Sequence, residues 1–273
     1  NAYEKQKFGI SGLPSVGTFD VLVIPVEISG SPFDLGYQEK LDVVFNGTAQ
    51  STGWQSVSSY YTLSSFGRLN LSFDIAPKFV TSNTRSYYEN LGQGGDQHAI
   101  VESLNGLDSQ IDYSKYDSNN DGYIDSVVFI YSVDYDYDQD PWWAWVYSAK
   151  YGEADSIGQL DGKNFEYYFW ASYSFLEDPI QGNSGLIYNA ETYIHELGHL
   201  MGMVDFYPYE GNNDYGPMGG FDMMDYNVGD HGPFTKLVFG WLKPLLATAG
   251  TYDVILESYA LDTDGEQSVL LIP

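Results

Sequence analysis

One stretch of this 273-residue chain decides how the rest is interpreted: Glu191-Thr192-Tyr193-Ile194-His195-Glu196-Leu197-Gly198-His199-Leu200-Met201-Gly202-Met203-Val204-Asp205. Apolar residues recur here at the spacing of a helix with one buried face; they are Ala190, Tyr193, Ile194, Leu197 and Met201. His195 and His199 lie one turn apart on another face, so their imidazole rings can converge on one metal ion. The pattern predicts a metal-binding helix over residues 189–202.

A third ligand is expected just beyond this helix. Catalytic zinc takes three protein ligands and keeps one position open for water. Gly202 can adopt the left-handed conformation that ends a helix and turns the chain back, which brings Asp205 under the metal. The spacing H-E-x-x-H-x-x-G-x-x-D therefore predicts His195, His199 and Asp205 as zinc ligands, with Glu196 as the general base that deprotonates a zinc-bound water.

Two other interpretations of the stretch stay open. A bare H-E-x-x-H also arises by chance, and His195 and His199 would then be ordinary helical residues. A later glutamate is the other possible third ligand, as in thermolysin-like enzymes. Glu210, Glu257 and Glu266 are the glutamates that follow His199, and none lies in a convincing helical segment, so Asp205 is favoured.

A second candidate metal site precedes this helix. Residues 117–125 match D-x-N-x-D-G-x-x-D, in which oxygen ligands wrap a hard cation and Gly122 permits a sharp turn. Val128 stands where an EF-hand has its bidentate Glu, so a calcium loop of the kind found in extracellular modules is expected. A metal-free turn is the alternative. The predicted calcium ligands are Asp117, Asn119, Asp121, the carbonyl of Tyr123 and Asp125.

The composition excludes several classes of protein. Asp and Glu number 38 against 11 Lys plus Arg, giving a formal net charge of −27, which opposes binding to nucleic acid or to anionic membranes. The absence of cysteine excludes disulfides and thiolate zinc sites. The sequence contains no run of ~18 apolar residues, so no membrane span is predicted. An acidic, cysteine-free chain that starts without Met at Asn1 suggests a processed, secreted protein.

Strand and helix signals alternate along the chain, which predicts an α/β or α+β fold. Pro25 places the first strand near an edge or a bulge. The aromatic segment 165–175 is a candidate cleft edge for an extended peptide, and an ordinary core strand is the alternative. Residues 204–234 read as loop. Strands are expected at 19–28, 69–75, 125–132, 165–175, 251–257 and 268–272, and helices at 37–45, 54–66, 97–105, 189–202 and 234–242.

Residues 195–205 resemble the metzincin clan, in which a glycine turn delivers the third zinc ligand. Asp205 in place of the more usual His is similar to the immune inhibitor A family of secreted bacterial metalloproteases. Phe206-Tyr207, the Gly-rich segment 219–225 that leads to Met223 and Met224, and the segment 233–244 also match that family. The resemblance covers roughly residues 19 to 250 and is densest from 185 to 245.

The resemblance implies an α+β, two-lobed catalytic domain with a mixed twisted sheet and an active-site helix. Its lobes would be residues 1–203 and 204–247, with a β segment over 248–273 as the start of a further domain. Met224, or its neighbour Met223, would be the Met-turn residue beneath the zinc. Tyr226 would stabilise the oxyanion, a role that His231 can also serve.

These expectations define a secreted zinc-dependent endopeptidase acting on protein or peptide substrates, with calcium as a structural ion and a monomer as the default state. Two alternatives remain. One is a zinc amidase acting on cell-wall or glycopeptide material, and the other is a zinc-containing binding module without catalysis. Glu196 argues against the second, because a purely structural zinc site has no need of that carboxylate.

Overall fold

The computed structural model describes residues 12–179, 185, 187–207, 216–227, 229–248, 250–251, 253–256, 258, 264–266 and 268–272. Within these residues a six-stranded mixed sheet has the order β2-β1-β4-β8-β5, with β3 also pairing with β1. All its strand pairs are parallel except β5–β8. The strands are β1 (Gly17–Ser29), β2 (Leu69–Ile75), β3 (Phe79–Thr84), β4 (Val127–Tyr131), β5 (Trp145–Ser148) and β8 (Tyr167–Ser172). The expected mixture of helices and a mixed sheet is confirmed, whereas the metzincin-like two-lobed architecture stays a prediction.

Strand β1 separates two hydrophobic cores. Val21 and Val23 face the first core, and Leu22 and Ile24 face the second. Because both faces of β1 are covered, its sequence is a nearly continuous apolar run, as is usual for a buried parallel strand.

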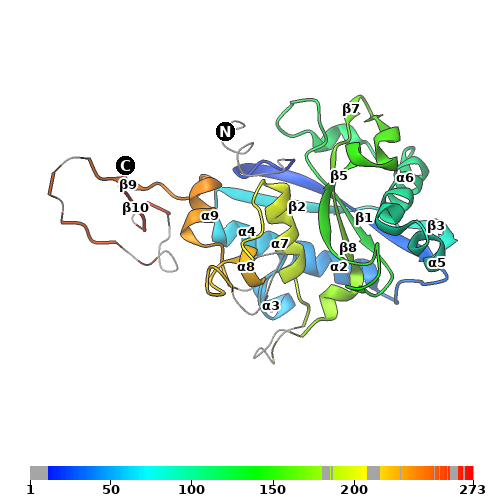
Figure 1. Ribbon diagram of the computed structural model, residues 1–273, viewed down its shortest axis with the longest axis horizontal. Helices are drawn as coiled ribbons and strands as arrows, with labels where there is room; N and C mark the ends of the chain where they lie inside the picture. The colour runs from blue at the N-terminus through cyan, green and yellow to red at the C-terminus, as the bar shows by residue number, and fades with distance from the viewer. Residues whose placement is uncertain are drawn as a thin grey trace.

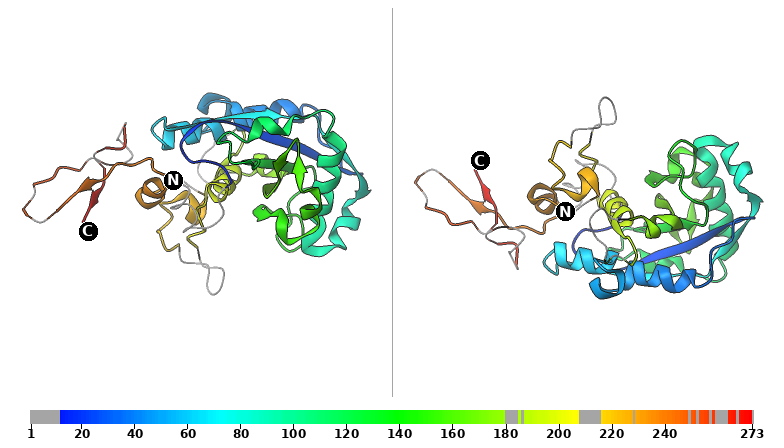
Figure 2. Two further views of the ribbon diagram at one scale, coloured as in Figure 1. Left: turned by 90° about the horizontal axis from the view of Figure 1, so that it is seen from above. Right: turned by 90° about the horizontal axis from the view of Figure 1, so that it is seen from below.

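Helices cover both faces of the sheet (Figures 1 and 2). The first core packs against α2 (Tyr37–Asn46), α4 (Val57–Ser64) and α7 (Glu191–Leu200). The second core packs against α5 (Arg85–Glu89) and α6 (Gly95–Leu107). Helix α7 therefore lies on the same side of the sheet as α2 and α4.

The remaining elements are short. Most of them belong to the connections that follow α6 and to the segment that follows α7. They are the helices α3 (Ala49–Thr52), α8 (Met223–Tyr226) and α9 (Pro233–Val238), the 3-10 turns η1 (Gly92–Gly94), η2 (Tyr113–Tyr116), η3 (Ala149–Tyr151), η4 (Glu153–Ile157) and η5 (Tyr173–Glu177), and the strands β6 (Gln159–Leu160), β7 (Lys163–Asn164), β9 (Leu245–Leu246) and β10 (Leu270–Leu271).

Of the two positions expected from Pro25, the edge is wrong, because β1 is an interior strand, whereas a register irregularity does lie nearby, between Glu27 and Ser29 in the pairing with β3. The backbone explains how proline is tolerated there. Val23 accepts a hydrogen bond from Ala76 just after β2, and the pairing with β3 begins only at Val26. The backbone of Pro25 points toward the same neighbouring strands as that of Val23, at the break where β2 has ended and β3 has not begun. The N–H that proline lacks would therefore have no partner in the ladder.

The aromatic segment is also not an edge. Strand β8 pairs with β4 on one side and with β5 on the other. The edge is β5, a four-residue strand that the sequence analysis did not predict. An extended peptide could therefore pair with β5 but not with β8.

The segment after α7 differs in detail from the expectation of loop followed by strands. Residues 204–234 contain α8 and the start of α9, and they run partly outside the described residues, as do Glu210 and Glu257. The described part of 251–257 is not a strand; β10 pairs instead with β9, and this ribbon stands apart from the main body in Figure 1. Across the described residues, no helix combines the length and the apolarity needed to cross a bilayer.

Candidate metal centre

Helix α7 is fixed to the core by its apolar face and by two tyrosine hydroxyls. The buried side chains of Tyr193, Ile194 and Leu197 belong to the first core. The Tyr61 hydroxyl of α4 donates to the Ile194 carbonyl at 2.6 Å. The Tyr193 hydroxyl donates to the carbonyl of Ser172, the last residue of β8, at 2.8 Å. The helix is thus held against both α4 and the sheet.

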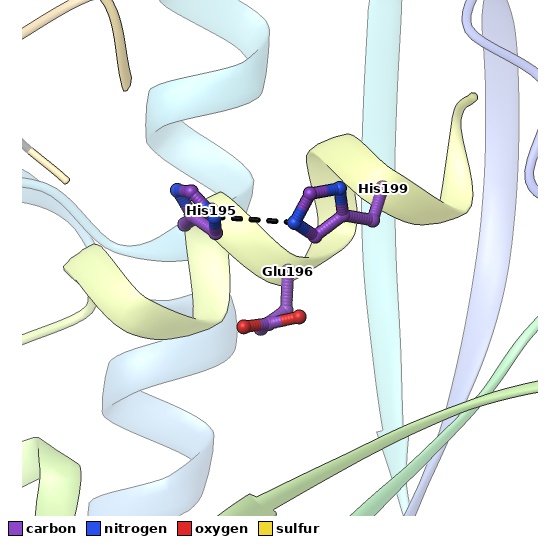
Figure 3. A group of neighbouring side chains, drawn as sticks. All are labelled: His195, Glu196 and His199. Carbon is purple, nitrogen blue, oxygen red and sulfur yellow. Dashed lines mark hydrogen bonds between the residues drawn. The ribbon is translucent and has the colours of Figure 1, made fainter. Parts of the chain in front are cut away.

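Both histidines are oriented by backbone carbonyls. The Nδ1 of His195 lies 2.9 Å from the Met223 carbonyl, and the Nδ1 of His199 lies 2.8 Å from the Met203 carbonyl. A carbonyl only accepts, so each Nδ1 carries a proton and Nε2 is the nitrogen of each ring that is left to bind a metal ion. Figure 3 shows the two rings facing each other along α7.

The turn after α7 brings Asp205 to these two nitrogens, as predicted. Gly202 has a φ of 97°, the left-handed conformation expected of it. Asp205 Oδ1 lies 2.8 Å from Nε2 of His195 and 3.2 Å from Nε2 of His199. The two Nε2 atoms are 3.2 Å apart. Three possible ligand atoms, two imidazole nitrogens and one carboxylate oxygen, thus lie within 3.2 Å of one another.

These distances fit a tetrahedral zinc site. Ligands at about 2.0–2.1 Å from a tetrahedral ion lie roughly 3.4 Å from one another. Two facing lone pairs also repel unless a cation or a proton lies between them. Burial opposes protonation of His199, but the hydrogen bond to Asp205 and the charges of Glu196 and Asp205 outweigh it and raise the pKa of His199 to about 9. The pocket therefore favours positive charge at this point.

Glu196 belongs to the same group but has a different position. Among the described residues, the ligand atoms of His195, Glu196 and His199 all lie within 4.8 Å of one another. Asp205 is nonetheless the better third ligand, because its Oδ1 is within 3.2 Å of both rings. Glu196 is 7% exposed, and its Oε2 has no hydrogen-bond partner. Burial raises the pKa of Glu196, and the two histidines oppose that rise.

Met224 lies beneath the helix next to His199. A Cβ built on Gly198 would be only 2.6 Å from the Met224 sulfur, so this glycine makes room for the methionine. Met223 contributes the carbonyl that orients His195 and has its side chain fully buried. Asp222 caps α8 by accepting from the Met224 N–H at 2.8 Å. The structure thus places both methionines at the centre and separates their contacts.

His231 is not placed where it could readily reach an oxyanion, so the structure does not favour the alternative role considered for it. Its side chain is fully buried among Tyr60, Tyr61, Phe239 and Trp241. Burial also lowers the pKa of His231, although the nearby Asp222 opposes this shift. It packs in the core rather than facing solvent.

Tyr226 lies near the candidate metal centre. It is 47% exposed and lines a cavity together with His195 and Glu196. Its role in catalysis stays a prediction.

Residues 117–125 fold as a tight turn whose side chains bind its own backbone. Asp117 accepts from the N–H groups of Asp121 and Gly122, and Asp121 accepts from that of Tyr123. Lys163 pairs with Asp117. Asp125 points to Ser118, whose N–H donates to it at 2.8 Å.

Asp117, Asp121 and Asp125 do not form a group with ligand oxygens within 4.8 Å of one another; among the described residues only the α7 cluster does. Asn119 donates to Asp121 and also accepts from its N–H. Calcium at this turn stays a prediction.

Two cavities flank Glu196. One, of about 500 Å³, includes His199, Asp205 and Val146 of β5 in its lining. The other, of about 400 Å³, includes His195, Thr192 and Tyr226. Trp143, Ala144 and Tyr207 line both, so the two cavities are neighbours beside the candidate metal centre.

Several residues of the site could not be found from the sequence. The carbonyls of Met203 and Met223 leave no side-chain signal. Tyr207, whose ring stacks beside His195 at 6.2 Å between centroids, was noted only as part of the resemblance. Trp143 and Ala144 precede a strand too short to show a period. The paired tryptophans Trp142 and Trp143 were the one available hint of it.

Comparisons of the sequence with protein-family models and with curated proteins find no match. The function therefore has to be inferred from the chemistry of the site itself.

Proposed function

We propose that the protein is a zinc-dependent endopeptidase with His195, His199 and Asp205 as metal ligands. The observation that carries this proposal is the convergence of two imidazole Nε2 atoms and one carboxylate oxygen within 3.2 Å. Nitrogen and carboxylate ligands in this number are those that catalytic zinc takes. Zinc bound there would supply Lewis acidity, which acidifies a water molecule and polarises a carbonyl group.

Glu196 would act as the proton carrier. Its Oε2 is buried without a partner, and its raised pKa brings the carboxyl nearer to neutral pH, where a general base can both accept and return a proton. The water oxygen bonds to the substrate carbonyl carbon and its proton passes to Glu196. The proton then moves to the leaving nitrogen as the C–N bond breaks, which yields a carboxylic acid and an amine.

The edge strand β5 is the feature that favours a peptide as the substrate. The N–H of Ala149 donates to the carbonyl of Glu166, which continues the register of the β5–β8 ladder. The backbone N–H and C=O groups of Tyr147 and Trp145 therefore also point toward β8. The N–H and C=O of Val146 therefore point away from the sheet. An extended peptide can pair with this free edge while its scissile bond lies before Glu196.

The test combines metal analysis with proteolysis. The purified protein should hold one zinc per chain and cleave casein or a quenched peptide, and a chelator should abolish cleavage. Glu196→Ala should lose turnover by at least about 10²-fold and keep its zinc, whereas Asp205→Ala should lose zinc. Full activity of Glu196→Ala would refute the proposal. Cleavage confined to cell-wall or glycopeptide amides would instead favour the amidase, and zinc without any turnover would favour the binding module. Secretion stays a separate prediction.

A further inference from the structure

The 400 Å³ cavity beside His195 has an acidic and aromatic lining. Its lining includes Asp178 and Asp225, together with the rings of Tyr135, Phe175 and Tyr226. No lysine or arginine lines this cavity or its neighbour among the described residues. Its electrostatic potential is therefore negative next to the candidate metal centre.

Asp225 is the most unusual group in this lining. The residue is only 2% exposed. Its Oδ2 accepts from the N–H groups of Met218 and Gly220, at 3.2 and 3.0 Å. Its Oδ1 is buried and has no hydrogen-bond partner. A buried carboxylate oxygen without a donor is unfavourable, so a donor from outside the chain would stabilise it.

The aromatic part of the lining suits the flat or aliphatic part of a cationic side chain. Tyr135 and Phe175 stack with their ring centroids 4.3 Å apart, and Trp143 meets both edge-on. The Tyr135 hydroxyl donates to Asp178 at 3.0 Å, which places a second carboxylate on this wall. Aromatic faces and carboxylates together favour guanidinium and ammonium groups.

We propose that this cavity binds a lysine or arginine side chain of the substrate, with Asp225 accepting its donors, so that the protein cleaves peptides next to a basic residue. The inference rests on the proposed endopeptidase function. A neutral donor such as a glutamine amide can satisfy Oδ1 but gains nothing from the two negative charges. Asp225 acts here as a specificity residue and takes no part in the chemical step.

The first experiment measures selectivity. Peptides that differ only in Arg, Lys, Gln or Met at one residue beside the scissile bond are compared by kcat/KM. Cleavage sites in a denatured protein digest locate that residue. We expect Arg or Lys to be favoured over Met by at least about tenfold. In Asp225→Asn, which keeps an oxygen for Met218 and Gly220, the ratio should fall toward one. Asp108→Asn, an exposed position at the end of α6, should keep the wild-type ratio.

The second experiment separates this inference from the proposed function. Zinc-loaded Glu196→Ala should bind the uncleaved Arg peptide at least about tenfold more tightly than the Met peptide, measured by calorimetry. If no peptide is cleaved by the wild type but this preference is found, the endopeptidase proposal fails and the cationic pocket stands. Cleavage or binding without preference for a basic residue overturns the pocket, and so does a preference that Asp225→Asn retains. If Asp225→Asn does not fold, Asp178→Asn must reduce the preference, and an unchanged ratio overturns the proposal.

Discussion

Backbone carbonyls, rather than side chains, orient both histidines of the candidate metal centre. The Met203 carbonyl belongs to the turn that delivers Asp205, and the Met223 carbonyl belongs to α8. The position of each imidazole is therefore coupled to the segment after α7. A change that displaces this segment should weaken metal binding even when all three ligands remain.

Gly198 offers a direct test of this coupling. A Cβ at Gly198 would lie 2.6 Å from the sulfur of Met224, so Gly198→Ala must displace the end of this buried side chain, which packs between α7 and α8. We expect Gly198→Ala to destabilise the fold by about 1–3 kcal/mol and to weaken zinc binding. Thermal unfolding and competition with a zinc chelator measure the two effects. The matched control is Gly94→Ala, where no atom lies within 4 Å of the new methyl group; wild-type zinc affinity in Gly198→Ala would show that the contact is unimportant.

At the scale of elements, the edge strand β5 decides where a peptide can bind. Its alternation sends Val146 toward the first core and Trp145 toward the second, while the backbone of Val146 faces away from β8. The edge is only four residues long, as is common for edges that must not pair indiscriminately.

A proline scan of β5 tests its role. Val146→Pro removes an N–H that makes no ladder bond, so the sheet should survive while one hydrogen bond to an extended substrate is lost. We expect kcat/KM for a long peptide to fall about three- to tenfold. Tyr147→Pro, which removes a donor to β8, should instead lower the unfolding temperature markedly. Equal peptide cleavage by Val146→Pro and wild type would exclude pairing at this residue.

Asp96 links α6 to β5 and β8 and predicts a pH dependence. Burial raises the pKa of Asp96 to about 6, although Tyr168, Trp145 and the Gln97 N–H donate to it. The folded protein thus holds this proton more tightly than the unfolded chain, whose Asp pKa is about 3.9. The contribution of Asp96 to stability is present below about pH 4 and is lost as pH rises to about 6.

Unfolding by urea across that range measures the effect. The free energy of unfolding should decline from about pH 4 to about pH 6 less steeply in Asp96→Asn than in wild type. Asp96→Asn also loses acceptors, so its stability should be lower throughout, and only the difference in slope reports the titration. Identical slopes in the two proteins would contradict a raised pKa.

The sequence predicted those elements that carry a clear period or an end signal. The apolar spacing of α7, the turn at Gly202 and the alternation of β2 all agree with the structure. Strand β3 was missed because its sequence, Phe79–Thr84, is mostly polar, and β5 was missed because four residues are too few to show an alternation. For residues 165–175 the sequence left an edge strand and a core strand open, and the core strand is confirmed; the choice depends on whether β5 pairs there, which is a long-range property. Whether His231 is buried or faces the metal centre likewise depends on how the residues around it pack.

For the whole molecule, a net charge of −27 is the dominant electrostatic fact. Like charges repel in the compact state, and cations that bind only the folded chain relieve this repulsion. The turn at 117–125 is where a divalent ion would act most strongly, since Asp117 and Asp125 are nearly buried there. Lys163 offsets only part of that charge through its pair with Asp117.

Calcium should therefore raise the unfolding temperature, and at saturation by more than an equal ionic strength of sodium chloride does. At about 100 times its dissociation constant a bound ion adds about 2.7 kcal/mol, which is roughly 5–10 °C for a chain of this size. Zinc is held constant so that the metal centre on α7 does not contribute. Asp121→Asn should lose most of the calcium response, because it removes the charge of a predicted calcium ligand. The turn should keep its fold, since Asp121 is exposed and the hydrogen bonds that Asp117 accepts from the backbone stay intact. Asp108→Asn removes the same charge elsewhere and should keep the response. A shift that sodium reproduces, or that Asp121→Asn retains, would assign the effect to general screening and leave this turn without calcium.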